Sequence, residues 1–474
     1  MKANKNHISP TAIARASKCL HSWYLECFGD PSKKREHDAG TLLIFQRGIE
    51  YEKKCIGSLS EVAEPCWDGK DLQAGFQSTV KLMKEGHAWI SGGILLNQSR
   101  LGFPDLLKRE EGDSIFGNHS YIPVDVKQHK FVNDKDRFQL LGYADLLESV
   151  LGTRPDRGGI WLNTGEIEEV ALVNLFDEFE GLLRKMELVW GGGKVTEGLR
   201  CGECNTCDWI DYCFETWKEK KSACLLYGVS GQTARKFTES GLHSWTEVMN
   251  STPIALASAL RTRPERARVL WLHAQAYAKG KPEIIKLPDF PAGVPIHFYD
   301  IENYGDTVYL HGDIRLFGKE RKVEQFLAKD PSQEKKVWHQ FLNFLARDEE
   351  AIVYCWADYE RGLANSLWEK YGGKKEGWKH LENNLVDQCK FVRDHFALPV
   401  HSYGIKTVAP VFGFSWSAED AGGLNSEAWY KEWLETGDKG VLQKILQYNL
   451  DDILAMEVID KKLRKFIVDG KGLC

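Results

Sequence analysis

The stretch YIPVDVK, residues 121–127, decides the fold expected for the first half of the chain. Its pattern is typical of a β-strand. Alternate side chains of a strand point to the same face, so Asp125 and Lys127 are expected together on one face. Strand and helix patterns alternate around it and predict an α/β domain. The neighbouring segments with these patterns are residues 88–96, 136–150, 158–163 and 172–188.

A second carboxylate, Asp105, follows Pro104 ahead of this strand. Carboxylates bind hard divalent cations such as Mg²⁺ or Mn²⁺, and a lysine beside them can steady an attacking hydroxide. An Asp-x-Lys alone is weak evidence for such a site, because surface strands often contain it. Two further pairs share a four-residue spacing: Gly48 with Glu52, and Gln139 with Tyr143.

In chain order these pieces read RGIEYE, GFPDLL, PVDVK and QLLGY. They resemble the RecB-like branch of the PD-(D/E)XK nucleases, in which Gly-x-x-x-(His/Glu), Gly-x-x-Asp, (Asp/Glu)-x-Lys and Gln-x-x-x-Tyr recur in this order. The resemblance implies a DNA nuclease that uses Mg²⁺ or Mn²⁺. It assigns three metal ligands, a catalytic lysine and two residues that position the strand being cut: Glu52, Asp105 and Asp125; Lys127; Gln139 and Tyr143.

Two of these assignments have alternatives. Gln139 and Tyr143 also fit a helix face that packs on the sheet. Glu50 lies two residues before Glu52. On a helix those two side chains point in different directions, so only one of them can join the site.

Four cysteines lie within thirteen residues, at Cys201, Cys204, Cys207 and Cys213. Such density favours structural zinc or an iron–sulfur cluster. Iron–sulfur members of the RecB branch place one cysteine before the nuclease core and three after it, spaced Cys-x2-Cys-x5-Cys. On that resemblance a [4Fe–4S] cluster is expected, with Cys201 as the alternative to the upstream thiol and zinc as the alternative to iron. The implied ligands are Cys19, Cys204, Cys207 and Cys213.

A second set of carboxylates begins in FYDIENYGDTVYLHG, residues 298–312. Asp300 and Glu302 occupy alternate positions of an expected strand and therefore share a face. Further acidic segments follow at ADYER and YNLDD. This spread suggests two-metal chemistry, in which two cations clamp the attacking and leaving oxygens.

The second set resembles the RNase H-like DEDD exonucleases, particularly the YprB-like branch. The resemblance implies that Asp452 is a further metal ligand and that Tyr448 orients the attacking water. Glu360 replaces the usual aspartate of the second motif, with Asp358 as a competing candidate and Asp387 as an acidic neighbour. An active 3′–5′ exonuclease and a degenerate binding domain both remain open. The implied site is Asp300, Glu302, Glu360, Tyr448 and Asp452.

Between the two constellations, residues 225–249 read LLYGVSGQTARKFTESGLHSWTEVM. They resemble helix-hairpin-helix modules, whose turn amides contact DNA phosphates. A plain helical connector is the alternative. If the module is present, four arginines are expected on its phosphate-facing side: Arg261, Arg263, Arg266 and Arg268.

The composition of the chain limits how it could bind nucleic acid and where it could be located. The chain has 474 residues, 43% of them hydrophobic and 27% charged, and a net charge of −6. No global positive field attracts nucleic acid, so binding must depend on local basic patches and metals. The start lacks the apolar segment of a secretory signal and no long apolar run is present, so a cytoplasmic protein without a membrane contact is expected.

Together the resemblances cover nearly the whole chain and predict three modules. These are an iron–sulfur PD-(D/E)XK nuclease at 1–220, a small helical connector at 221–290 and an RNase H-like domain at 291–474. The expected partner is DNA, as single strands or ends; RNA cleavage by the C-terminal site is an alternative, and a protein partner stays open. The main rival is a nucleic-acid-binding scaffold in which one or both sites are silent.

Overall fold

The computed structural model describes residues 6–348, 350–418 and 422–471. The chain divides into two compact units, one formed by residues 1–36 and 44–215 and the other by residues 37–43 and 216–474. Both units are mixed α/β, which agrees with the expected fold class. Among the described residues, no helix is both long and apolar enough to cross a membrane.

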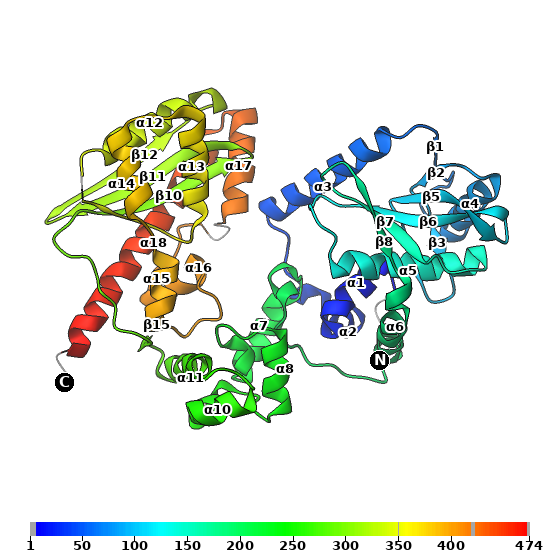
Figure 1. The fold of residues 1–474 in the computed structure, drawn as a ribbon, viewed down its shortest axis with the longest axis horizontal. Coiled ribbons are helices and arrows are strands. Elements are labelled where there is room, and N and C mark those ends of the chain that lie inside the picture. Colours follow the sequence, from blue (N-terminus) through cyan, green and yellow to red (C-terminus); the bar gives the residue numbers. More distant parts are fainter. Residues whose placement is uncertain (1–5, 349, 419–421, 472–474) are drawn as a thin grey trace. The chain divides into compact units, whose positions relative to one another are not determined.

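The first unit contains a six-stranded sheet in the order β1-β2-β5-β6-β7-β8 (Figure 1). The hairpin of β5 and β6 is antiparallel, whereas β6 and β7 are parallel, with Asp125 opposite Ile160. The strands are β1 (Val62–Ala63), β2 (Trp89–Ser91), β5 (Leu106–Ser114), β6 (Gly117–Val126), β7 (Arg157–Trp161) and β8 (Ile167–Ala171). A separate pair is formed by β3 (Leu95–Leu96) and β4 (Leu101–Gly102).

The helices of this unit supply much of its core, which joins residues of α1, α2, α5 and α6 to β7 and β8. Those four helices and two further ones are α1 (Pro10–Lys18), α2 (Leu20–Phe28), α3 (Ala39–Gly57), α4 (Leu72–Glu85), α5 (Asp134–Leu151) and α6 (Phe176–Trp190).

The pattern that opens with Ser9 and Pro10 predicts a single helix that runs to about Tyr24, with Ser9 as its N-cap. Ser9 caps it by accepting a hydrogen bond from the Ala12 amide, as expected. The predicted continuation to Tyr24 is wrong, because Cys19 is extended, with φ −150° and ψ 99°, and divides the segment into α1 and α2. The Cys19 carbonyl then accepts from the backbone and hydroxyl of Ser22, which opens the second helix.

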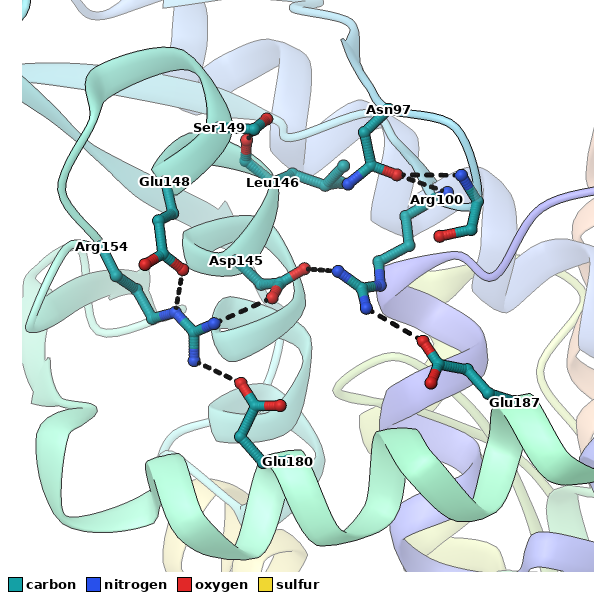
Figure 2. A network of polar contacts seen from close by, with 10 residues as sticks. Asn97, Arg100, Asp145, Leu146, Glu148, Ser149, Arg154, Glu180 and Glu187 are labelled. Carbon is teal, nitrogen blue, oxygen red and sulfur yellow. Dashed lines mark hydrogen bonds and ion pairs between the residues drawn. The ribbon is translucent and has the colours of Figure 1, made fainter.

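Two arginines and the buried Asp145 fix helix α5 in the first unit (Figure 2). Asp145 accepts from Arg100 at 2.6 Å and from Arg154 at 3.0 Å. The same arginines reach α6, where Arg100 bonds Glu187 and Arg154 bonds Glu180. The network therefore links the turn between β3 and β4 to both helices, and it holds the helix that carries Gln139 and Tyr143.

The second unit contains a five-stranded sheet in the order β12-β11-β10-β13-β14 (Figure 1). The first three strands in sequence are antiparallel, and β13 and β14 then run parallel to β10. The strands are β10 (Ile296–Tyr304), β11 (Thr307–Phe317), β12 (Glu320–Leu327), β13 (Ile352–Cys355) and β14 (Leu385–Asp387).

Alternation along β10 assigns its side chains to two cores. Tyr299 and Ile301 pack with Trp338 and Phe341 of α12, whereas Phe298 packs with residues of α18. Asp300 and Glu302 share the Phe298 face, so they point toward α18. The larger helices around this sheet are α12 (Glu334–Leu345), α13 (Tyr359–Tyr371), α14 (Lys375–Asn384), α15 (Gln388–His395), α17 (Gly423–Thr436) and α18 (Lys439–Lys471).

Short helices precede this sheet and belong to the same unit. β9 (Glu283–Ile284) pairs with β15 (Phe396–Ala397), and buried His273 bonds the carbonyl of Leu398. The division into three modules at residues 220 and 290 stays a prediction. The helices are α7 (Ile210–Glu219), which begins in the first unit, α8 (Gly231–Glu239), α9 (Trp245–Asn250), α10 (Pro253–Ala259) and α11 (Pro264–Lys279).

Candidate active sites

Three carboxylates meet where β10 faces α18 in the second unit. Asp300 and Glu302 come from the strand and Asp452 from the helix. Each offers one oxygen, and these three oxygens all lie within 4.8 Å of one another. Glu302 and Asp452 are each 6% exposed, so the group is largely shielded from water.

Burial raises the pKa of all three carboxyl groups, and the charges of the neighbouring carboxylates raise it further for Asp300 and Glu302. For Asp300 the largest cause is burial, followed by the charges of Glu302 and Asp452. Burial also leads for Glu302 and for Asp452. Carboxylates this close disfavour one another's charge, and a bound cation would reverse that effect. The oxygen donors therefore fit a hard divalent cation such as Mg²⁺ or Mn²⁺.

Asn449 orients Asp300, although it is not among the residues predicted for the site. Its Nδ2 donates to Oδ2 of Asp300 at 2.8 Å, while its Oδ1 accepts from Gln325 at 2.9 Å. Gly312 lies opposite Asp300 on β11 and leaves room for this amide. The available signal was the spacing in YNLDD, because Asn449 and Asp452 are three residues apart on one helix face.

Trp416 orients Asp452 by donating from Nε1 to Oδ1 at 2.6 Å. The neighbouring Asp451 has a different role, since its carboxylate accepts from the backbone amide of Ser417 at 2.7 Å. Tyr448 lies one turn before Asp452 and is buried, and burial raises the pKa of its hydroxyl. Of the two adjacent aspartates, Asp452 is therefore the one that joins the carboxylate group.

Glu360 and Asp358 occupy different environments. Glu360 is 4% exposed, its Oε2 has no hydrogen-bond partner, and burial raises its pKa to about 8. The charge of Glu360 also contributes to the raised pKa of Asp300. Asp358 is exposed and pairs with Arg361 at 2.8 Å. The structure thus turns Glu360 inward and Asp358 outward.

Asp387 holds the turn that produces this arrangement. Its Oδ1 accepts from the amide of Ala357 at 3.1 Å and caps α15 by accepting from Lys390 at 2.9 Å. Ala357 has a φ of +82°, a backbone conformation that is rare outside glycine. Asp387 therefore supports the second acidic motif rather than lying among the three carboxylates.

Residues 297–464 match the model of the RNase_H superfamily. The matched range contains all five residues predicted for the C-terminal site, and the presence of an RNase H-like domain is confirmed. No curated protein matches the chain significantly. The match indicates nuclease activity on nucleic acid in general, and nucleases of this superfamily use Mg²⁺ or Mn²⁺. It does not extend to the first unit, where the RecB-like assignment stays a prediction.

The first unit brings most of its predicted site residues together. Asp125 on β6 is 1% exposed, and Nζ of Lys127 lies 2.5 Å from its Oδ2. Apart from this ion pair, neither oxygen of Asp125 accepts a hydrogen bond of regular geometry. Asp105 accepts from the Val126 amide at 2.7 Å, and burial, then the charge of Asp125, raise its pKa to about 9.

Helix α3 presents Glu52 to this group. Burial, and then the charge of Asp125, raise the pKa of Glu52. Glu50 is exposed and accepts from Gln46 at 2.8 Å on the same helix. Of the two glutamates that the sequence left open, Glu52 is therefore the one near Asp125.

Tyr143 packs inside the first unit and supports the loop before Asp105. Its hydroxyl donates to the carbonyl of Phe103 at 2.9 Å and accepts from Gln139 at 3.4 Å. Burial raises the pKa of Tyr143 well above its usual value. His129, which belongs to none of the predicted motifs, bonds Asp136 through its ring at 2.8 Å near Lys127.

Cys201 lies among the predicted cluster thiols. Its Sγ is 3.8 Å from that of Cys204, and its amide donates to Cys204 Sγ at 3.3 Å. Hydrogen bonds from Cys19, then from Cys204, lower the pKa of Cys201 to about 3. The structure thus brings together the thiol that the resemblance includes, Cys19, and the one it leaves out, Cys201. Either of them could be the fourth ligand beside Cys204, Cys207 and Cys213, and this choice stays open.

Two of the four arginines in the connector bind within their own unit. Arg266 donates to the carbonyl of Gly228 at 3.3 Å and to the hydroxyl of Thr233 at 3.1 Å. Arg268 donates to the carbonyl of Ile285 at 3.2 Å. These bonds hold the segment together, and a contact of the four arginines with phosphates stays a prediction.

Proposed function

We propose that this protein is a metal-dependent nuclease and that Asp300, Glu302 and Asp452 hold its divalent cations. The observation that carries the proposal is the convergence of three carboxylate oxygens within 4.8 Å inside a domain that matches the RNase_H superfamily. Bound Mg²⁺ or Mn²⁺ would polarise the phosphodiester and activate the attacking water.

Side chains around the three carboxylates orient them and complete the proposed site. Asn449 fixes the rotamer of Asp300 and Trp416 fixes that of Asp452. Tyr448, whose raised pKa keeps its hydroxyl neutral, is the residue proposed to orient the attacking water. The unpartnered Oε2 of Glu360 supplies a further acceptor for a cation.

We propose a single nucleic-acid strand as the substrate, cut from its 3′ end. The support is the order of motifs shared with DEDD exonucleases, from Asp300 to Asp452. DNA is the substrate proposed first, and RNA is the alternative that the same site accommodates.

The test is the Mn²⁺-dependent cleavage of end-labelled single-stranded DNA and RNA. Wild type should cleave from the 3′ end, and Glu360→Gln and Asp452→Asn should lose this activity. Asp358→Asn is the matched control, because Asp358 is exposed and pairs with Arg361. Loss of cleavage in Asp358→Asn, with full activity in Glu360→Gln, would assign the role of the second acidic motif to Asp358 instead of Glu360.

A second candidate site is favoured by the burial of Asp125. A carboxylate that is 1% exposed, with one ammonium partner and no regular hydrogen bond, fits a cation site. We propose that Glu52, Asp105 and Asp125 bind Mg²⁺ or Mn²⁺ there, with Lys127 as the catalytic lysine and Gln139 and Tyr143 near the DNA. The proposed [4Fe–4S] cluster at Cys19, Cys204, Cys207 and Cys213 belongs to the same unit. Adding Lys127→Ala to Asp452→Asn tests this site, because it should abolish the DNA cleavage that Asp452→Asn alone leaves.

A further inference from the structure

Lys406 lies beside the three clustered carboxylates of the second unit, and its Nζ makes no hydrogen bond there. Its Nζ is shielded from solvent and has no hydrogen-bond acceptor among the described residues. Its ion pair with Oδ1 of Asp452 spans 3.9 Å. That separation is too long for a hydrogen bond, so the three donors of the ammonium group are unused.

Two aromatic rings hold the ammonium group in place. Nζ lies 4.5 Å from the centre of the Trp416 ring and 4.4 Å from that of the Tyr448 ring. Both rings belong to the site, since Trp416 bonds Asp452 and Tyr448 lies one turn before it. Ring faces attract a cation, but they offer it no oxygen acceptor.

The geometry distinguishes this lysine from a simple counter-ion. Lys127 in the first unit pairs closely with its buried aspartate, at 2.5 Å from Oδ2 of Asp125. Lys406 is kept at a distance from Asp452 by the two rings, and its donors stay available. A shielded ammonium group without acceptors is costly, so an anion that supplies oxygen acceptors would bind there favourably.

We propose that Lys406 binds a non-bridging phosphate oxygen of the nucleotide held at Asp300, Glu302 and Asp452. The inference rests on the proposed function, because the phosphate is the anion that a nuclease brings to its carboxylates. A lysine suits this contact as a compact charge with three donors that can follow the phosphate oxygens. Lys406 is therefore a substrate-binding residue of the C-terminal site.

The test is calorimetric binding of thymidine 5′-monophosphate and of uridine 5′-monophosphate to the full chain in Mn²⁺. Binding of Mn²⁺ alone is measured in parallel. The variants are Lys406→Met and Lys406→Arg, with Lys406→Gln in place of the first if that protein does not fold. Lys322→Met is the matched control, since Lys322 also lies over an aromatic ring, at 5.6 Å from Phe344, but pairs with Glu324 at 2.7 Å.

Lys406→Met should weaken nucleotide binding by roughly 10- to 100-fold, as expected for a lost charged hydrogen bond. Lys406→Arg should retain most of the affinity and Lys322→Met all of it. Binding of Mn²⁺ alone should stay equal or tighten, because a positive charge has left the carboxylates. Unchanged nucleotide binding in Lys406→Met, an equal loss of Mn²⁺ binding, or no nucleotide binding by wild type would each overturn the inference. Cleavage by the same wild-type preparation decides the proposed function separately.

Discussion

Asn449 on α18 donates a hydrogen bond of 2.8 Å to Asp300 on β10, across the strand residue Gly312. A Cβ at Gly312 would lie 2.0 Å from Oδ1 of Asn449. Gly312→Ala should therefore displace this amide and lower the free energy of unfolding by about 1–3 kcal/mol. Cleavage by the C-terminal site should fall by about 10- to 100-fold, as for other residues that orient metal ligands. Thermal melting and cleavage rates measure the two effects.

The matched control for this change is Gly362→Ala. Gly362 lies in α13 of the same unit, and a Cβ there meets nothing within 4 Å. Alanine favours helix more than glycine, so this variant should be as stable as wild type or slightly more so. Wild-type cleavage by Gly312→Ala would show that Asn449 does not position Asp300.

Glu360 should make stability depend on pH in metal-free protein. Its pKa rises from 4.5 to about 8 in the folded state, mainly through burial. The folded state thus holds the proton more tightly than the unfolded state. The contribution of this group is fully present below about pH 4.5 and is lost as the pH rises through about 8. Glu360→Gln should consequently raise the melting temperature in EDTA at pH 8 to 9 and change it little at pH 4.

Asp358→Asn is the control in this series, because the exposed Asp358 pairs with Arg361 at the surface. It should change the melting temperature little at any pH in this range. A Glu360→Gln protein that melts like wild type at pH 9 in EDTA would contradict the burial of this carboxylate.

Lys127→Ala should destabilise the first unit as well as affect its proposed chemistry. Asp125 is 1% exposed, and the substitution removes its ammonium partner. Since the Lys127 side chain is 25% exposed, the cost should be about 1–3 kcal/mol, below that of breaking a fully buried pair. Adding Asp125→Asn should recover part of it in a double-mutant cycle. Lys130→Ala, at an exposed position, is the control. Additive effects of Lys127→Ala and Asp125→Asn on the free energy of unfolding would argue against the ion pair.

The proposed cluster predicts iron and sulfide in protein purified without oxygen. Cys204→Ser should lower the iron content strongly, whereas Cys66→Ser, at an exposed thiol outside the predicted ligand set, should not. Comparing Cys19→Ser with Cys201→Ser identifies the fourth ligand. Of these two variants, we expect that Cys201→Ser retains iron and that Cys19→Ser does not. Stoichiometric zinc without iron or sulfide would contradict the cluster.

The sequence predicted the parts of the C-terminal site that follow regular spacing. Asp300 and Glu302 alternate on a strand, and Asp452 lies one helical turn after Tyr448, so periodicity places each of them on a known face. Trp416 and Lys406 were missed, because Trp416 lies in an irregular segment and Lys406 in α16 (Ile405–Val408), a helix too short to show a period. They meet Asp452 only through tertiary packing.

Local backbone conformation was harder to predict than the face of a strand or helix on which a side chain lies. The inward turn of Glu360 depends on the φ of +82° at Ala357, and alanine does not signal such a conformation. The break at Cys19 has neither proline nor glycine at that residue to announce it. In both places hydrogen bonds decide the conformation, from Ala357 to Asp387 and from Ser22 to Cys19.

Mn²⁺-dependent cleavage of end-labelled single-stranded DNA and RNA by three proteins tests whether the C-terminal carboxylates perform metal-dependent hydrolysis. These are wild type, Lys127→Ala, and Asp300→Asn combined with Glu302→Gln. We expect that wild type cleaves from the 3′ end and that the double variant loses this activity while Lys127→Ala retains it. Full activity in the double variant, or no cleavage by wild type, would contradict the assignment of metal-dependent hydrolysis to Asp300, Glu302 and Asp452.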